Sequence, residues 1–200
     1  MIVATVGLFG SKALWYLMRA SGVVSLVLLT GVIVLGIATV NRWRPGRLPR
    51  FVTASLHRSI SLLAVVFVAV HVVTAVADPY AMVGVAAVVV PFVAAKSALW
   101  VGLGALSLDV IGALIVSSLL RRHIGRRVWR ALHWLAYLAW PLAVFHGLGM
   151  GSDSSALWLR AVTGACIVLV GLAVAFRLRW QEPAKHLEPQ RVPVLARAAA

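Results

Sequence analysis

Residues 55–73 read SLHRSISLLAVVFVAVHVV, a mostly apolar run with one histidine near each end. The two histidines, His57 and His71, are fourteen residues apart, which is about 21 Å along an α-helix. Fourteen residues return to within about 40° of the starting face, so both side chains point the same way. The run extends on both sides and predicts a membrane-spanning helix over residues 51–77.

The composition of the whole chain agrees with a membrane location. Of its 200 residues, 62% are hydrophobic and only 12% are charged. The mean hydropathy is +0.98, more than a soluble domain with so few charges can carry. Inside a bilayer every backbone polar group needs a partner within the protein, and the apolar runs lack strand alternation, so the runs are helices. We therefore expect an all-α membrane protein in which the lipid bilayer is the main surrounding partner.

Five apolar runs are long enough to span a bilayer. The expected helices cover Ala13–Val40, Phe51–Ala77, Ser97–Leu120, Val128–Met150 and Ala156–Phe176. A further apolar piece, Ala81–Ala95, is interrupted by Pro91 and is too short to span. We expect it to form a short interfacial or re-entrant segment that covers one end of the bundle.

Basic residues fix the expected orientation. The formal net charge is +14, and the basic residues gather in residues 41–50, 121–130 and 177–200, which fall on one side if five helices alternate. The positive-inside rule places that side in the cytoplasm. We expect the membrane to be a bacterial plasma membrane. This placement explains the charge without nucleic-acid binding. We expect an extracytoplasmic N-terminus at residues 1–12, a transmembrane domain at 13–176 and a disordered cytoplasmic tail at 177–200.

A second histidine pair, His133 and His146, lies in the fourth expected helix. These residues are thirteen apart, which leaves them about 140° away from a common face on an ideal helix. Pro141 lies between them, and a proline can kink or rewind a helix. We therefore expect Pro141 to restore a common face.

The second and fourth helices run in the same direction, so depth pairs His57 with His133 and His71 with His146. Two histidines at each level can ligate one haem, which makes all four candidate metal ligands and bis-histidine haem the expected cofactor. The competing interpretation is four unrelated histidines that each bond to a neighbouring helix. Four histidines at matched depths favour haem. His123 and His186 lie in basic, polar surroundings and are expected to be solvated.

The pattern resembles the ferric reductase-like transmembrane domain family, which includes ferric reductases, NADPH oxidases and the haem-binding membrane subunit of the bacterial methionine sulfoxide reductase system. The resemblance covers roughly Leu14 to Phe176. The motifs that carry it are His57-x13-His71, His133-x12-His146, Leu56-His57-Arg58, Trp129-Arg130-Ala131-Leu132-His133-Trp134-Leu135-Ala136-Tyr137 and Trp15-Tyr16-x2-Arg19-Ala20-Ser21-Gly22.

The resemblance implies two stacked haems b that carry single electrons across the membrane to an extracytoplasmic acceptor. A ferric chelate, oxygen or a reductase or flavin partner could be that acceptor. Larger family members carry a C-terminal flavin domain, for which residues 177–200 are too short. We therefore expect a separate flavoprotein reductase or a quinol as the donor, with flavin present only in a partner. No catalytic residue is predicted, and whether the chain is itself an enzyme stays open.

Anionic haem propionates need cationic partners near each membrane surface. On the cytoplasmic side the candidates are Arg58 and Arg130, with Arg127 beside them, and on the opposite side Arg19 and Lys96. These residues could instead serve topology or extend to the interface. For Arg19 a haem role is favoured, because this residue lies about two turns inside the first helix, where a bare charge is costly.

Two residues have open roles. Asp109 lies near the centre of the third helix, where it could be protonated, bond to another helix or move protons. Trp140 lies two turns beyond His133 and either assists transfer between haems or packs in the bundle, with packing favoured. Two alternative functions stay open: a haem-free proton or metal transporter lined by histidine and aspartate, and a quinol-linked cytochrome b.

Overall fold

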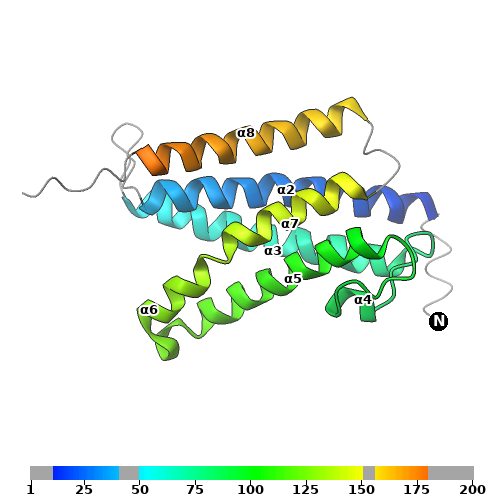
Figure 1. Cartoon of the computed structure of the whole chain (residues 1–200), viewed down its shortest axis with the longest axis horizontal. Helices are drawn as coiled ribbons and strands as arrows, with labels where there is room; N and C mark the ends of the chain where they lie inside the picture. Colours follow the sequence, from blue (N-terminus) through cyan, green and yellow to red (C-terminus); the bar gives the residue numbers. More distant parts are fainter. Residues whose placement is uncertain (1–10, 41–49, 151–155, 180–200) are drawn as a thin grey trace, which may run out of the picture.

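The structure, a computed structural model, describes residues 11–40, 50–150 and 156–179. Every regular element among these residues is an α-helix (Figure 1). The helices are α2 (Ser11–Val40), α3 (Arg50–Ala77), α4 (Ala86–Val89), α5 (Ala98–Leu119), α6 (Arg121–His133), α7 (Ala136–Gly149) and α8 (Leu157–Arg179). The expectations for residues 1–10, 41–49, 151–155 and 180–200 lie outside the described residues.

Four of these helices, α2, α3, α5 and α8, are each long and apolar enough to cross a membrane. The bent pair α6 and α7 provides a fifth span if the two helices are counted together. The prediction of an all-helical, multi-pass membrane protein is therefore confirmed. α8 continues to Arg179, so Arg177 and Arg179 belong to this helix and not to the tail in which the sequence prediction placed them.

The fourth predicted helix is broken, and the break is not at the expected place. α6 ends at His133, α7 begins at Ala136, and the two axes differ by 44°. At the break the amides of Trp134 and Leu135 bond to carbonyls three residues back, which is tighter than α-helical bonding. Pro141 lies inside α7, beyond the break. The expectation that Pro141 restores a common face for His133 and His146 is thus wrong, because the helix is rewound at residues 134–135, ahead of the proline.

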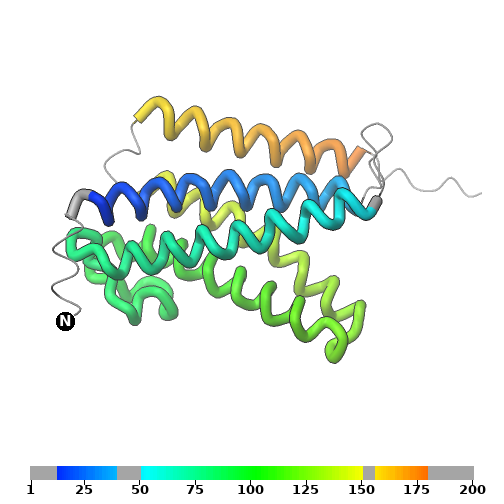
Figure 2. Tube along the Cα trace, turned by 180° about the vertical axis from the view of Figure 1, so that it is seen from behind, coloured from blue at the N-terminus to red at the C-terminus, as the bar shows by residue number. Residues whose placement is uncertain are grey.

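Two helix pairs build the bundle. α2 lies along α3 and α5 lies along α7, while α8 packs against α2 (Figures 1 and 2). Two apolar clusters join α2, α7 and α8. The first contains Leu26, Val144 and Cys166. The second contains Ile33, Ile37 and Val170. Trp140 packs against both clusters, and its indole Nε1 donates a 2.9 Å hydrogen bond to Oγ1 of Thr30. Trp140 is therefore a packing residue between α7 and α2, as the favoured interpretation held.

Several buried serine and threonine side chains of the bundle donate hydrogen bonds to backbone carbonyls. Ser25 and Thr30 donate to the carbonyl oxygens four residues back along α2, at 2.7 and 2.8 Å. Ser107 of α5 instead donates to the carbonyl of Ala139 in α7 at 2.9 Å. Since an unpaired polar group in a membrane interior is costly, these bonds let serine and threonine pack between helices.

The segment that joins α3 to α5 folds over one end of the bundle. Its regular structure is the four-residue helix α4, and its residues Ala87 and Ala94 pack against Val101 of α5. The ring of Phe92 lies so close to Gly102 that no side chain would fit at that glycine. The segment is thus too short to span and covers this end, which we call the α4 end; the opposite end is the α6 end (Figure 1).

Candidate functional site

Four histidine side chains meet in two pairs, in which α3 contributes His57 and His71, α6 contributes His133 and α7 contributes His146. At the α6 end, the ring centroids of His57 and His133 are 6.4 Å apart and the ring planes cross at 73°. Towards the α4 end, the rings of His71 and His146 are 6.1 Å apart and cross at 78°. These are the pairs expected from depth. The break between α6 and α7 allows two residues thirteen apart to face the two histidines of α3.

Three of the four rings are held by backbone carbonyls of neighbouring helices. The Nδ1···O contacts join His57 to Val32, His71 to Met18 and His146 to Trp100, at 3.1, 2.8 and 2.8 Å. A carbonyl oxygen only accepts hydrogen bonds, so each Nδ1 carries the proton and donates it. In the neutral ring, Nε2 then keeps the lone pair that a metal ligand needs.

Small residues opposite the rings make room for them. A Cβ on Gly22 would lie 2.9 Å from Nδ1 of His71, and one on Gly36 would lie 3.4 Å from Cε1 of His57. A Cβ on Gly104 of α5 would lie 2.7 Å from Nδ1 of His146. Three of the four histidine positions therefore have a glycine as their close neighbour on a facing helix.

The sequence analysis missed these glycines, although a signal was present. Gly22 and Gly36 are fourteen residues apart on α2, and this spacing repeats that of His57 and His71 on α3. Two adjacent helices with equal spacings place each glycine at the level of one histidine. The matched spacing could have identified α2 as the helix that contacts α3.

A cavity of about 680 Å³ surrounds the His71/His146 pair. Its volume lies within the range of about 300–1,000 Å³ found for small-molecule and cofactor sites. Its lining includes two cations, Arg19 and Lys96, together with Tyr80. The Arg19 guanidinium also lies 4.1 Å from the ring centroid of Trp15, which keeps it near the cavity. Both cations that the sequence predicted for this end thus line the cavity at its histidine pair.

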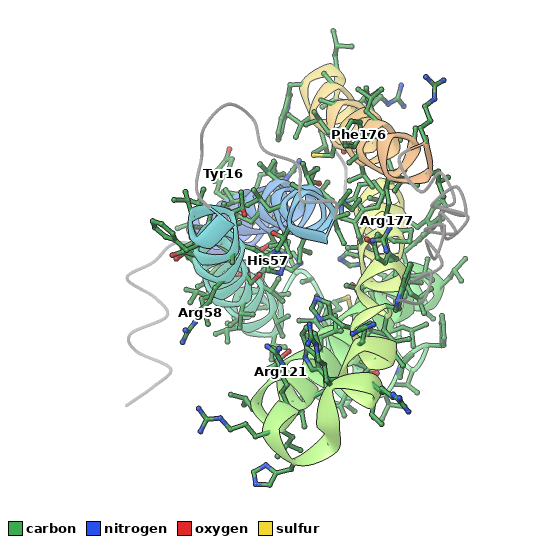
Figure 3. All side chains as sticks on the ribbon, turned by 90° about the vertical axis from the view of Figure 1, so that its left-hand side faces the viewer. Tyr16, His57, Arg58, Arg121, Phe176 and Arg177 are labelled. Carbon is green, nitrogen blue, oxygen red and sulfur yellow. The ribbon has the colours of Figure 1, made fainter. Side chains whose placement is uncertain are left out.

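The predicted cations at the α6 end are placed less favourably. Arg58 and Arg130 are both exposed, and Arg58 points away from the bundle (Figure 3). The arginine that approaches the His57/His133 pair is Arg121, whose guanidinium lies 4.4 Å from the ring centroid of Trp129. Trp129 in turn stacks on His133. Arg121 was not predicted for this site because it is twelve residues from His133 along the chain and approaches only across the turn at Gly125, where φ is 78°.

The donor set suits an axially ligated cofactor. A metal ion bonded to one nitrogen of each ring at about 2 Å puts the ring centroids about 6 Å apart, close to both spacings. Among residues 11–40, 50–150 and 156–179, no group of three or more His, Cys, Asp or Glu side chains could hold a metal ion. A bare zinc ion is usually held by three or four protein ligands, whereas haem needs only two. A pair of imidazoles at each level therefore fits haem.

Asp109 lies apart from both pairs. It is in the middle of α5 and is exposed on the outer face of the bundle. Of the roles left open for Asp109, a bond to a neighbouring helix has no support in this exposed position.

Comparison with known proteins adds one finding. Residues 21–144 match the family model described as ferric reductase like transmembrane component. The matched range includes Gly22, His57, His71 and His133 and ends two residues before His146. No curated protein and no solved structure matches the chain significantly.

Proposed function

Because the chain belongs to the ferric reductase-like transmembrane component family, we propose that it is a b-type cytochrome that carries single electrons across the membrane. His57 and His133 ligate one haem, and His71 and His146 ligate the other. The observation that carries this proposal is the pair of imidazole spacings, 6.4 and 6.1 Å, at two levels of the same bundle. When bound, haem iron supplies a one-electron redox couple.

The protein's own residues hold the ligands ready. The carbonyl oxygens of Val32, Met18 and Trp100 accept the Nδ1 protons and thereby fix both the tautomer and the orientation of three rings. The hydrogen bonds also make these imidazoles stronger donors to a metal. A ligand set that is rigid before the cofactor binds loses less entropy on binding.

Charge supports a direction for the path. The exposed arginines of α6, which include Arg122, Arg126 and Arg130, place a basic surface at the α6 end. The positive-inside rule assigns this end to the cytoplasm, so the N-terminus is outside and the C-terminus is inside. A flavoprotein reductase or a quinol delivers electrons near His57/His133. They leave beside His71/His146 to an extracytoplasmic ferric chelate, oxygen or reductase partner.

Arg19 and Lys96 complete the site at the α4 end. Both line the cavity that contains His71 and His146, and both provide positive charge there. We assign them to the carboxylates of the haem at this level, where ion pairing offsets the cost of placing Arg19 inside a membrane helix. At the α6 end we assign this role to Arg121, with Arg58 and Arg130 contributing to the surrounding positive potential.

The test is a reduced-minus-oxidised absorption spectrum of the purified chain, with haem and protein quantified on the same sample. The proposal predicts b-type bands and about two haems per chain. A protein that folds as a helical membrane protein but binds no haem would contradict it and would favour a haem-free transporter. Reduction of bound haem by a quinol, and not by a flavoprotein, would identify a quinol-linked cytochrome b.

A further inference from the structure

One histidine is held differently from the other three. Nδ1 of His133 is buried and makes no hydrogen bond with any residue that the structure describes. The rings of His57, His71 and His146 each donate from Nδ1 to a carbonyl of another helix. A free imidazole can rotate about its side-chain bonds, so a ligand without this hydrogen bond needs another constraint.

The ring of His133 has a stacking contact with an aromatic side chain instead of a hydrogen bond from Nδ1. Trp129 precedes His133 by one helical turn on α6, and the two ring centroids are 4.8 Å apart with planes only 23° from parallel. The Arg121 guanidinium lies 4.4 Å from the centroid of the same indole. The indole Nε1 of Trp129 also points to Oγ of Ser118 in α5 at 3.5 Å. The indole is therefore held by two neighbours of its own.

We propose that Trp129 is the positioning residue of His133 and fixes the plane of this ligand by stacking. The proposal rests on the proposed function, because it concerns the ring as a haem ligand. Stacking restricts the imidazole to orientations nearly parallel to the indole, whereas a hydrogen bond from Nδ1 fixes a direction. Without an acceptor at Nδ1, His133 would also be a weaker donor to a metal than His57.

The test compares two substitutions that both remove the indole of Trp129 but differ in whether an aromatic ring remains. Trp129→Phe keeps an aromatic face, and Trp129→Leu keeps apolar bulk without one. Both are introduced into a His71→Ala background, in which the remaining haem is held by His57 and His133. The readouts are the low-spin electron paramagnetic resonance spectrum, which reports ligand ring orientation, and the midpoint potential.

We expect Trp129→Phe to keep the parent spectrum and potential. We expect Trp129→Leu to broaden or shift the low-spin signal and change the midpoint potential, or to lose the remaining haem. In a His57→Ala background, neither substitution should affect the haem at His71/His146. Trp158→Leu is the matched control in the His71→Ala background, because Trp158 is an exposed tryptophan of α8 that lines the cavity of the other histidine pair.

Two results would overturn the proposal. One is a Trp129→Leu protein whose spectrum and potential equal those of Trp129→Phe. The other is an equal response of the haem at His71/His146, because it would show a general loss of structure. Failure of the proposed function itself is recognised separately, since the protein with unchanged histidines would then bind no haem.

Discussion

Gly22 of α2 faces the imidazole of His71 in α3 so closely that a Cβ on Gly22 would lie 2.9 Å from Nδ1 of the ring. The same nitrogen is 2.8 Å from the carbonyl oxygen of Met18, one turn earlier on α2. The missing side chain at Gly22 thus allows the ring to reach the backbone of α2. This close approach makes α2 part of the site although it contributes no histidine.

Substitutions of three glycines along α2 should give a graded series. Gly22→Ala should displace His71 and lower haem content at that level, because real Cβ atoms do not occur at 2.9 Å from a neighbour. Gly36→Ala, with 3.4 Å to His57, should have a small effect. Gly31→Ala is the matched control, since its nearest neighbour is Ile60 at 3.8 Å. Haem per protein after purification measures the series.

Each of the three substitutions changes glycine to alanine inside a helix, so a difference between them reports packing and not helix propensity. Alanine is favoured over glycine inside a helix by about 1 kcal/mol, and this gain is similar at all three positions. Gly31→Ala should therefore keep both haems and slightly raise thermal stability. Equal haem content in Gly22→Ala and Gly31→Ala would show that the contact between α2 and His71 does not matter.

Arg19 should tune the haem at the α4 end. A nearby cation stabilises the reduced form of an iron centre, so Arg19→Leu should lower the midpoint potential of the haem at His71/His146. A loss of about 1 kcal/mol of charge interaction corresponds to a shift of some tens of millivolts. Potentiometric titration in a His57→Ala background measures this haem alone.

The control for Arg19 is Arg58→Leu, which removes an exposed arginine that points away from the bundle (Figure 3). It should leave the potential of the His71/His146 haem unchanged. An unchanged midpoint potential in Arg19→Leu, or an equal shift in Arg58→Leu, would contradict a role for Arg19 beside this haem.

Pro141→Ala tests what sets the histidine register. Because the helix is rewound at Trp134 and Leu135, ahead of Pro141, this substitution should keep both haems. It also removes a residue that disfavours a helix interior, so stability should not fall. Loss of the haem at His71/His146, measured as haem per protein, would instead assign the register to the proline.

Arg177 should fasten the end of α8 to α7. Its Nη1 donates to the hydroxyl of Tyr137 at 2.6 Å, and its guanidinium lies 4.6 Å from the ring centroid of Trp134. Tyr137→Phe removes one hydrogen bond that involves a charged group, which costs about 1.5–3 kcal/mol when buried and less here. A thermal unfolding scan should show a lower midpoint than for Tyr16→Phe, a control at an exposed tyrosine. Equal midpoints would contradict this role.

Much of the fold can be predicted from the local composition of the sequence. The apolar runs of α2, α3, α5 and α8 predict spanning helices because a bilayer tolerates no unpaired backbone at all. The pairing of His57 with His133 and of His71 with His146 also follows from depth, since helix rise is nearly constant. Features that depend only on distance along a helix were therefore predictable.

Features that depend on contacts between helices were not. The break at Trp134 and Leu135 has no proline or glycine to mark it, and sequence reasoning therefore assigned it to Pro141. Arg121 contacts Trp129 across a turn that only Gly125, with its positive φ, makes possible. The carbonyls that hold the histidine rings leave no sequence signal, because every residue has one.

The central claim is that two levels of the bundle each hold one haem, and removal of one histidine at a time tests it most directly. Haem and protein are quantified in His57→Ala, His71→Ala and the double variant, with His123→Ala as control for an exposed histidine outside both pairs. We predict about two haems per chain in the unchanged protein and in His123→Ala, about one in each single variant and none in the double variant. Retention of two haems in either single variant, or none in the unchanged protein, would contradict the account.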